Sequence, residues 1–259
     1  MDGDKEFTLA RITTIGGLLG IKTAPVVARL TPLAGKWRGA LVATIPHRFN
    51  ALSITCNVAR DTAREICGPW LDELAGDRIA LELGATSTVA HSDEAAIPAG
   101  APEGVQALGD DLASVGWDGE AWTYAMTQQN PDDAAVDAAI ARFDAVAQTV
   151  GATEAQRKIA ARLHRSLSRG QPSRAWVRAR AGKLDPILTL SWDLVEWLPI
   201  QHMMSGFYPA IDTTTKIGRL ARAVGIEHCT VELVLGPVDP PGMRILVQLD
   251  PGGTFAPDR

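Results

Sequence analysis

Cysteine is too scarce in this chain of 259 residues to support a disulfide framework or a zinc site. The three cysteines, Cys56, Cys67 and Cys229, make an odd count and show no CxxC spacing. We interpret them as buried free thiols in a reducing compartment, and we expect the protein to be cytoplasmic.

Several other signals are missing. No apolar run approaches the roughly 20 residues of a membrane span, and the acidic first residues, MDGDKEF, do not resemble a secretory signal. No GxGxxG, GxxxxGK[ST] or GxSxG motif occurs, so dinucleotide, P-loop and α/β-hydrolase chemistry are not indicated. The net charge of −5 gives no reason to expect a nucleic-acid binder. Any anion site must therefore be local.

The stretch from Arg174 to Asp193 carries the most informative pattern. One face of its first arm is basic and aromatic, with Arg174, Trp176, Arg178 and Arg180. The second arm, 186–193, alternates too, and turn residues at 182–185 join the arms, which predicts an antiparallel hairpin. Unpaired guanidinium groups are too costly to desolvate in a dry core, so this face must meet water or a wet cavity.

The rest of the chain mixes helical and strand patterns. Alternation predicts six further strands, at 38–45, 50–57, 77–84, 120–127, 229–236 and 243–249. Apolar spacing predicts helices at 8–20, 25–34, 61–75, 103–115, 130–150, 154–168 and 213–224, and a short one within 193–209. Gly68-Pro69 should kink or split the helix at 61–75. The stretch 91–102 is rich in alanine, proline and glycine and predicts a loop.

These elements recur in a fixed order. Leu108-Gly109 and Val115-Gly116 match Ile217-Gly218 and Val224-Gly225 at a constant offset of 109. The hairpins at 38–57 and 174–193 match at an offset of 136. The unit is a helix, a glycine stop and paired strands, used about four times. We interpret 1–259 as a single domain with internal αββ repeats, in approximate halves 1–130 and 131–259.

Each predicted strand pair has one apolar and one polar face. Helices must cover the apolar faces, which leaves all the polar faces on the other side of the sheet. A closed sheet would collect those faces into a lumen, whereas an open sheet would expose them to water. Arginines, hydroxyls and aromatic rings together suit a pocket for an anion beside an apolar group. We therefore expect an α+β fold, in which repeated helix–strand–strand units form an antiparallel β-barrel with helices outside and a polar lumen.

This layout resembles the ABBA aromatic prenyltransferases, the prenyltransferase-barrel family. The residues Gly17–Ile21, followed by a helix and two strands, look like the N-terminus of the phenol-modifying branch, and Thr189–Asp193 is similar to a strand of the later repeats. The chain would be a divergent, short member, because the family barrel usually has ten strands and eight are predicted here. The resemblance implies transfer of an allylic prenyl group from its diphosphate to a small aromatic acceptor. The alternative is a non-catalytic barrel that binds a hydrophobic small molecule or lipid.

The resemblance also implies roles for the lumen candidates. Guanidinium groups would hold the diphosphate as its negative charge grows. The candidates are Arg174, Arg178 and Arg180 of the hairpin, with Arg78 and Arg244 on strands beside it. Aromatic and hydroxyl side chains would line the prenyl and acceptor sites: Trp176, Trp122, Tyr124, Ser53, Thr55, Asn57, Thr189 and Ser191. A base must remove the ring proton, and the candidates are Glu232, His228 and Asp193. No cofactor is certain, although Mg²⁺ could accompany the prenyl diphosphate.

Simpler interpretations stay open. The arginines fit a surface ion-pair ladder, and the aromatic residues fit packing beneath a helix. Asp132, Asp133 and Asp137 resemble the magnesium motifs of isoprenoid enzymes, but acids in a first helical turn complement the helix dipole. The other histidines lack metal-ligand spacing and are interpreted as structural: His47, His91, His164 and His202. The remaining rivals are an open sheet that stacks on single-stranded nucleic acid, which the net charge disfavours, and a symmetric structural subunit.

Overall fold

The computed structural model describes residues 2–94, 105, 112–225 and 227–249. Its strands are β1 (Arg38–Pro46), β2 (Ser53–Ala59), β3 (Arg78–Leu83), β4 (Thr88–Ser92), β5 (Leu112–Trp117), β6 (Trp122–Gln128), β7 (Ser173–Arg180), β8 (Lys183–Glu196), β9 (His228–Leu235) and β10 (Gly242–Gln248). Its α-helices are α1 (Asp2–Leu19), α2 (Ala24–Leu30), α3 (Arg60–Cys67), α5 (Asp133–Thr149), α6 (Glu154–Leu167), α7 (Trp197–Phe207) and α8 (Thr213–Val224). Short 3₁₀ turns follow α2 and α3, at Thr31–Leu33 and Gly68–Glu73.

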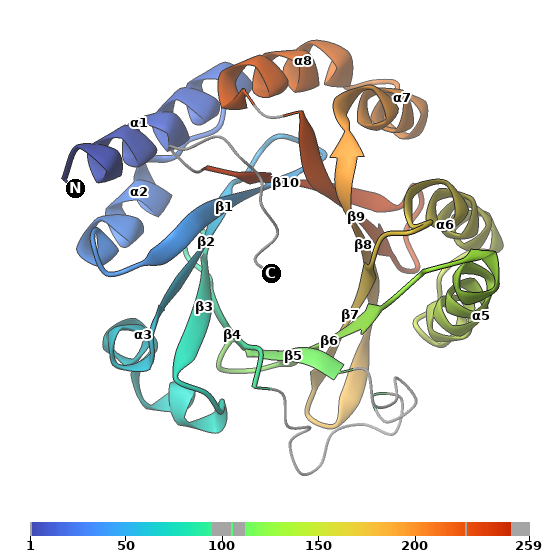
Figure 1. Ribbon diagram of the computed structural model, residues 1–259, viewed down its shortest axis with the longest axis horizontal. Coiled ribbons are helices and arrows are strands. Elements are labelled where there is room, and N and C mark those ends of the chain that lie inside the picture. The colour runs from blue at the N-terminus through green and yellow to red at the C-terminus, as the bar shows by residue number, and fades with distance from the viewer. Residues whose placement is uncertain (1, 95–104, 106–111, 226, 250–259) are drawn as a thin grey trace.

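The ten strands form a closed antiparallel barrel (Figure 1). Each strand pairs with its neighbours in the sequence, and β1 closes the ring on β10 through five register pairs that run from Val42↔Gln248 to Pro46↔Arg244. Every strand therefore has hydrogen-bonded neighbours on both sides. The expected antiparallel barrel with outer helices is confirmed.

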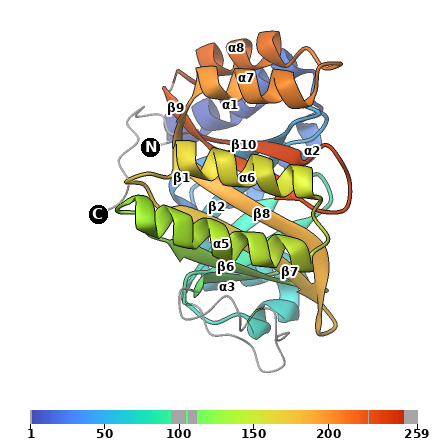
Figure 2. The same cartoon turned by 90° about the vertical axis from the view of Figure 1, so that its right-hand side faces the viewer.

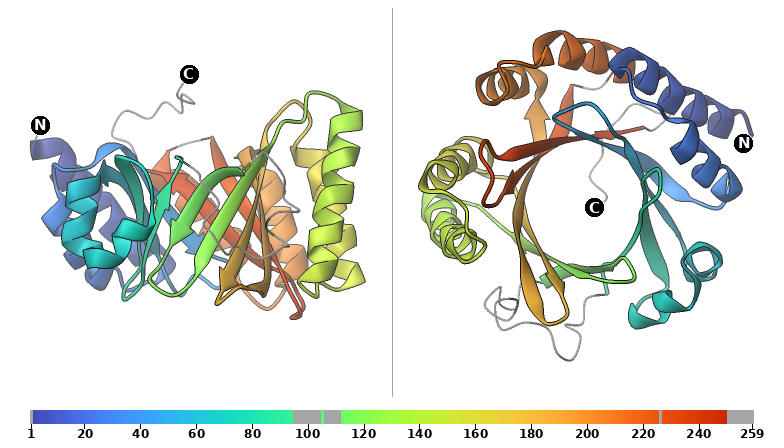
Figure 3. Two further views of the ribbon diagram at one scale, coloured as in Figure 1. Left: turned by 90° about the horizontal axis from the view of Figure 1, so that it is seen from below. Right: turned by 180° about the vertical axis from the view of Figure 1, so that it is seen from behind.

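The helices stand outside the barrel in a ring, which the view from behind in Figure 3 shows clearly. Figure 2 shows α5 and α6 side by side across β8, while α7 and α8 lie together near α1. None of the described helices has the length and apolar character that crossing a membrane requires. The division of the chain into one domain with two similar halves stays a prediction.

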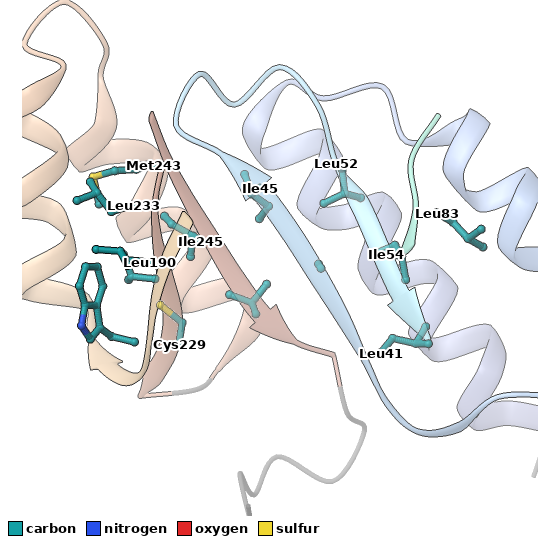
Figure 4. Packing of buried hydrophobic residues seen from close by; sticks show 14 of the residues in the cluster. Leu41, Ile45, Leu52, Ile54, Leu83, Leu190, Cys229, Leu233, Met243 and Ile245 are labelled. Atoms are coloured by element: carbon teal, nitrogen blue, oxygen red, sulfur yellow. The ribbon is translucent and has the colours of Figure 1, made fainter. Parts of the chain in front are cut away.

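The hydrophobic core lies between the outer face of the barrel and these helices. On β1, Leu41, Ala43 and Ile45 are buried, and on β2 Ile54 and Cys56 are buried, at every second position of each strand. Figure 4 shows Leu41, Ile45 and Ile54 among the residues of this cluster. Burying such a side chain stabilises the fold by about 1.5–3 kcal/mol. The period of two in the sequence thus determines which face of each strand meets the helices.

The hairpin predicted at 174–193 is present, but its turn lies earlier than expected. Ala181 and Gly182 have positive φ angles of 48° and 76°, and Arg180 pairs with Lys183 across them. A two-residue turn of this kind matches the twist of the flanking strands. The predicted turn at 182–185 was wrong because these residues, despite their turn-like composition, belong mostly to β8.

Two strands were not predicted, so the count of eight was wrong. The predicted loop at 91–102 begins inside β4, and the predicted helix at 103–115 ends inside β5; most of both stretches lies outside the described residues. The strands have only five and six residues. Small residues such as Ala90 and Gly116 also leave little apolar contrast between the two faces.

The helix predictions agree with the structure in two informative places. Gly68 ends α3 and begins the 3₁₀ turn, as the Gly-Pro pair predicted. Asp132 accepts a hydrogen bond from the backbone N–H of Ala135 and so caps α5. Asp133 forms an ion pair with Arg169, just after α6, and Asp137 forms one with Arg165 of α6. The capping interpretation is therefore confirmed for Asp132, and Asp133 lies in the first turn as expected, whereas Asp137 lies further along the helix.

A buried hydrogen bond joins α6 to β8. Trp192 Nε1 donates to His164 Nδ1 over 3.2 Å, and each side chain is 1% exposed. Because Nδ1 accepts this bond, the imidazole is neutral and carries its proton on Nε2. Burial lowers the pKa of His164 to about 4.

Acidification should therefore destabilise the fold through His164. The unfolded histidine has a pKa near 6.5. The contribution of the neutral His164 side chain to stability is therefore complete above that pH and is lost as the pH falls toward about 4. The loss should be about 2 kcal/mol by pH 5. Urea unfolding at pH 7 and pH 5 should show that the free energy of unfolding falls less for His164→Gln than for the wild type. The exposed His202→Gln is the control and should behave like the wild type; equal losses in all three proteins would contradict the assignment.

Candidate functional site

The inner face of the barrel, on the side away from the helices, is defined by strand register. Residues directly opposite each other on neighbouring strands point to the same side of a sheet. Arg174 is opposite Ser191, Ser191 is opposite Glu232, and Glu232 is opposite Arg244. These four side chains therefore follow one another around the inside, across β7, β8, β9 and β10.

The inner face is polar and accessible to solvent. The side chains of Glu82, His91 and Asp193 remain 28%, 17% and 21% exposed. Leu81 and Leu83, which flank Glu82 on the outer face of the same strand, are completely buried beneath the helices. Water therefore reaches the inside of the barrel, and the predicted polar lumen is confirmed.

Four titratable side chains form what we term the central cluster: Glu82, His91, Glu232 and Arg244. Arg244 Nε lies 2.8 Å from Glu232 Oε2. The Nη2 atom of the same guanidinium donates to Thr189 Oγ1 over 3.2 Å, reaching past β9 to β8. Glu232 is only 7% exposed. The guanidinium thus compensates a nearly buried carboxylate and also contacts a neighbouring hydroxyl.

The other half of the central cluster surrounds Glu82. Ser53 Oγ donates to Glu82 Oε1 over 2.7 Å, and His91 Nε2 lies 3.9 Å from Glu82 Oε2. The imidazole of His91 also packs edge-on against Trp176, with ring centroids 5.8 Å apart. The two halves bring together side chains from seven strands.

The two carboxylates of the cluster have opposite pKa shifts. Burial raises the pKa of Glu232, against the lowering effect of the Arg244 guanidinium. Burial also raises the pKa of Glu82, but contacts with His91 and Ser53 outweigh it and hold the value at about 2. Carboxyl pairs whose pKa values are pushed apart in this way commonly take different roles in proton transfer. Glu82 is the ionised member, and Glu232 accepts a proton more readily.

Two ring nitrogens at this place lack a hydrogen-bond partner among the described residues. They are Trp176 Nε1 and His91 Nδ1, and both atoms are buried. A buried polar atom without a partner costs about 1–3 kcal/mol, and water or a bound molecule usually satisfies it. The inner face therefore has hydrogen-bonding capacity that the chain does not use.

The arginines predicted to bind diphosphate do not form one clamp. Arg174 and Arg78 lie near one end of the barrel, and Arg178 and Arg180 lie near the other. Arg244 belongs to the central cluster. The expectation that Arg78 and Arg244 lie on strands next to the hairpin was wrong, because β6 and β9 are its neighbours.

Most of these arginines have carboxylate partners. Arg174 lies 3.3 Å from Asp193 and Arg180 lies 3.4 Å from Glu120. Arg178 contacts Asp118 and lies 3.6 Å from a second carboxylate, on Asp185. Arg78 is exposed and has no ion-pair partner in the part of the chain that the structure describes. Positive charge on the inner face is therefore largely balanced by negative charge.

Comparison with known proteins gives a match in structure alone. No protein-family model matches the chain, and no curated sequence matches it significantly. It is similar to 5-dimethylallyl tryptophan synthase from Streptomyces coelicolor in complex with DMASPP and Trp, with a TM-score of 0.70, 14% identity and coverage of 98% of this chain and 97% of that one. The chain has the prenyltransferase-barrel fold.

The prenyltransferase PriB is similar as well. Its binary complex with product diphosphate gives a TM-score of 0.59 at 12% identity, and its ternary complex with L-tryptophan and dimethylallyl thiolodiphosphate gives 0.55 at 11%. Each comparison covers 95% of this chain and 96% of the other. The resemblance to the prenyltransferase barrel that the sequence suggested is thus confirmed at the level of the fold.

The inward orientation expected for Trp122 and Tyr124 was wrong. In this barrel they lie opposite Ala179 and Val177, whose side chains face the core, and Tyr124 is 1% exposed. On β6 the smaller residues face inward instead. Large aromatic side chains gain more free energy from burial beneath the outer layer than threonine does.

The other candidates are distributed along the barrel. Thr230 Oγ1 donates to Asp193 Oδ1 over 2.7 Å, beside Arg174. His228 begins β9, opposite Glu196 at one end of the barrel. The remaining candidates lie on inner-face positions of β2, β7 and β8: Ser53, Thr55, Asn57, Trp176, Thr189 and Ser191. What these residues bind stays a prediction.

Sequence reasoning missed two members of the central cluster. Glu82 received no role, and His91 was interpreted as structural. The only signal for His91 was the alternation of a five-residue strand inside a stretch predicted to be a loop. Its proximity to Glu82 depends on the pairing of β3 with β4, which the sequence pattern did not indicate.

Glu82 should stabilise the folded protein except in strong acid. Its folded pKa of about 2 lies below the unfolded value, so its contribution is complete above about pH 4.5 and is lost as the pH falls through about 2. The contribution should not exceed about 3 kcal/mol, because water partly screens the carboxylate. The difference in unfolding free energy between the wild type and Glu82→Gln should therefore shrink from pH 5 to pH 2.5. For the exposed Glu120→Gln the difference should stay near zero; a constant difference for Glu82→Gln would refute the assignment.

Proposed function

We propose that this protein transfers an allylic prenyl group from its diphosphate to a small aromatic acceptor inside the barrel. The observation that carries the proposal is the central cluster: two carboxylates with opposite pKa shifts beside the guanidinium of Arg244. The barrel around it has the fold of 5-dimethylallyl tryptophan synthase, whose complex contains DMASPP and Trp. The chemistry of the cluster and the fold support the same reaction class.

The first step is the cleavage of the bond between the allylic carbon and the diphosphate oxygen. Negative charge grows on the leaving group, and preplaced guanidinium groups lower that barrier. Arg244 and Arg174 are the arginines proposed for this role, because Arg178 lies near the other end of the barrel. Each of the two already has a carboxylate partner. Binding of the diphosphate would exchange one anion for another, which avoids the desolvation of an isolated guanidinium group.

The second step joins the allylic carbon to a ring carbon of the acceptor. The ring of Trp176 faces inward and is proposed to shield the allylic cation through its π-electrons. Thr189 and Ser191 provide nearly buried hydroxyls on the neighbouring strand. Trp122 and Tyr124 are not part of this proposal, because they belong to the outer core.

The last step removes the ring proton. Glu232 is proposed to accept this proton, because burial raises its pKa and so favours its protonated form. Glu82 stays ionised and can accept a hydrogen bond from an N–H or O–H group of the acceptor. Asp193 is engaged by Arg174 and Thr230, and His228 lies at the start of its strand, so both are poorer candidates.

Among the described residues, no group of three or more His, Cys, Asp or Glu side chains could hold a metal ion. We propose that any Mg²⁺ arrives with the diphosphate.

A non-catalytic binding barrel is the second candidate. The observation that favours it is the charge balance of the inner face, since ion-paired arginines also suit an uncharged hydrophobic ligand. Thermal unfolding with ligands distinguishes the two functions. A prenyltransferase should be stabilised by dimethylallyl or geranyl diphosphate more than by pyrophosphate. A binding barrel should instead respond equally to the prenyl alcohol.

Turnover should depend on Glu232. The protein is incubated with both allylic diphosphates and a panel of phenols and indoles, and prenylated products are detected by mass. Glu232→Gln should lower kcat by about 10²- to 10⁴-fold, because a positioned base contributes a factor of that order. The control Glu196→Gln removes an exposed carboxylate from β8 and should keep wild-type turnover. The absence of any product from the wild type, with all donors and acceptors, would count against the enzymatic function.

A further inference from the structure

His91 lies where it can hold Glu82 in place from the opposite side to Ser53. In the strand register, Glu82 is opposite Thr55 on β2 and opposite Val89 on β4. Ser53 is two residues before Thr55 on β2, and His91 is two residues after Val89 on β4. Ser53 and His91 therefore lie on opposite sides of Glu82 along the barrel axis. The carboxylate thus has a hydroxyl on one oxygen at 2.7 Å and an imidazole near the other at 3.9 Å.

The contact between His91 and Trp176 spans strands that are not neighbours. His91 is on β4 and Trp176 is on β7, with β5 and β6 between them. The residues beneath this contact are small: Gly116 is opposite His91, and Ala125 is opposite Trp176. Two large rings can meet over the inner face because the intervening strands offer almost no side chain there.

Gly116 is required at its position by the imidazole. A Cβ atom at residue 116 would lie 2.4 Å from His91 Nδ1 and 2.8 Å from its Cε1. Real Cβ atoms essentially never make such close contacts, so any side chain here would displace the ring. The imidazole therefore packs directly on the backbone of β5, which fixes its approach to Glu82.

We propose that His91 is a positioning residue that acts through Glu82, and that Gly116 provides the space in which the imidazole lies. The effect on turnover rests on the proposed function, in which Glu82 orients the aromatic acceptor. His91 transfers no group itself. The Nδ1 atom, buried and without a partner within the described residues, lies over Gly116, while Nε2 points toward the carboxylate.

The physical coupling can be measured without any turnover. The ¹⁵N shifts of the His91 imidazole, assigned by comparison with His91→Gln, should change in Glu82→Gln and in Gly116→Ala. They should not change in Gly206→Ala, because a Cβ at residue 206 in α7 meets nothing within 4 Å. Unchanged shifts in both Glu82→Gln and Gly116→Ala would overturn the inference whether or not the protein is an enzyme.

The kinetic consequence has a distinct pattern. His91→Leu should lower kcat for prenyl transfer at least tenfold with the KM for the diphosphate unchanged. His91→Gln, whose amide can still donate to Glu82, should recover most of that loss. In the Glu82→Gln background, His91→Leu should have no further effect, because the two residues act as one unit.

Other outcomes separate the positioning role of His91 from the proposed function. Equal losses in His91→Leu and His91→Gln, following a common loss of thermal stability, would indicate packing alone and overturn the positioning role. If the wild type is inactive while the imidazole shifts respond to Glu82→Gln, the proposed function fails and the contact between the two residues stands. If the wild type is active and the imidazole shifts do not respond, the proposed function stands and the positioning role of His91 fails.

Discussion

The pairing of β1 with β10 is the interaction on which the rest of the structure depends. It joins the first and last strands of the sheet and turns a row of hairpins into a ring. Without it, Val42 to Pro46 and Arg244 to Gln248 would be unsatisfied edges, and the polar face would meet bulk water. Closure places Arg244 within this junction, on β10, and Glu232 on the adjacent β9, and turns both inward, toward Thr189 and the rest of the inner face.

Enclosure also determines the electrostatics of the inner face. Charges surrounded by the barrel wall interact more strongly than charges on an open surface, so each must be compensated. This accounts for the pairing of Arg174, Arg178 and Arg244 with carboxylates. It also separates the pKa values of Glu82 and Glu232, since Glu82 accepts a hydrogen bond from Ser53 and lies near His91, whereas Glu232 is more deeply buried. Charge balance and acid–base asymmetry thus come from the same geometry.

Small residues matter as much as charged ones in this arrangement. Gly116 and Ala125 carry almost no side chain, yet they allow His91 and Trp176 to meet across two strands. The outer face shows the opposite distribution, with Tyr124 and Trp192 packed beneath the helices. The outer face therefore buries large aromatic side chains, while small residues on β5 and β6 leave space on the inner face for His91 and Trp176.

The sequence by itself determined the local features of this protein. Period-two alternation gave eight of the ten strands and the long hairpin, and the acids at 132 and 133 gave the start of α5, because these depend on neighbours a few residues apart. Only the tertiary structure decided that the arginines are divided between the two ends, that Trp122 and Tyr124 face the core, and that His91 reaches Glu82. Those facts depend on strand register and on closure of the barrel. The face to which each side chain points is determined by the summed burial of many residues that are distant in the sequence.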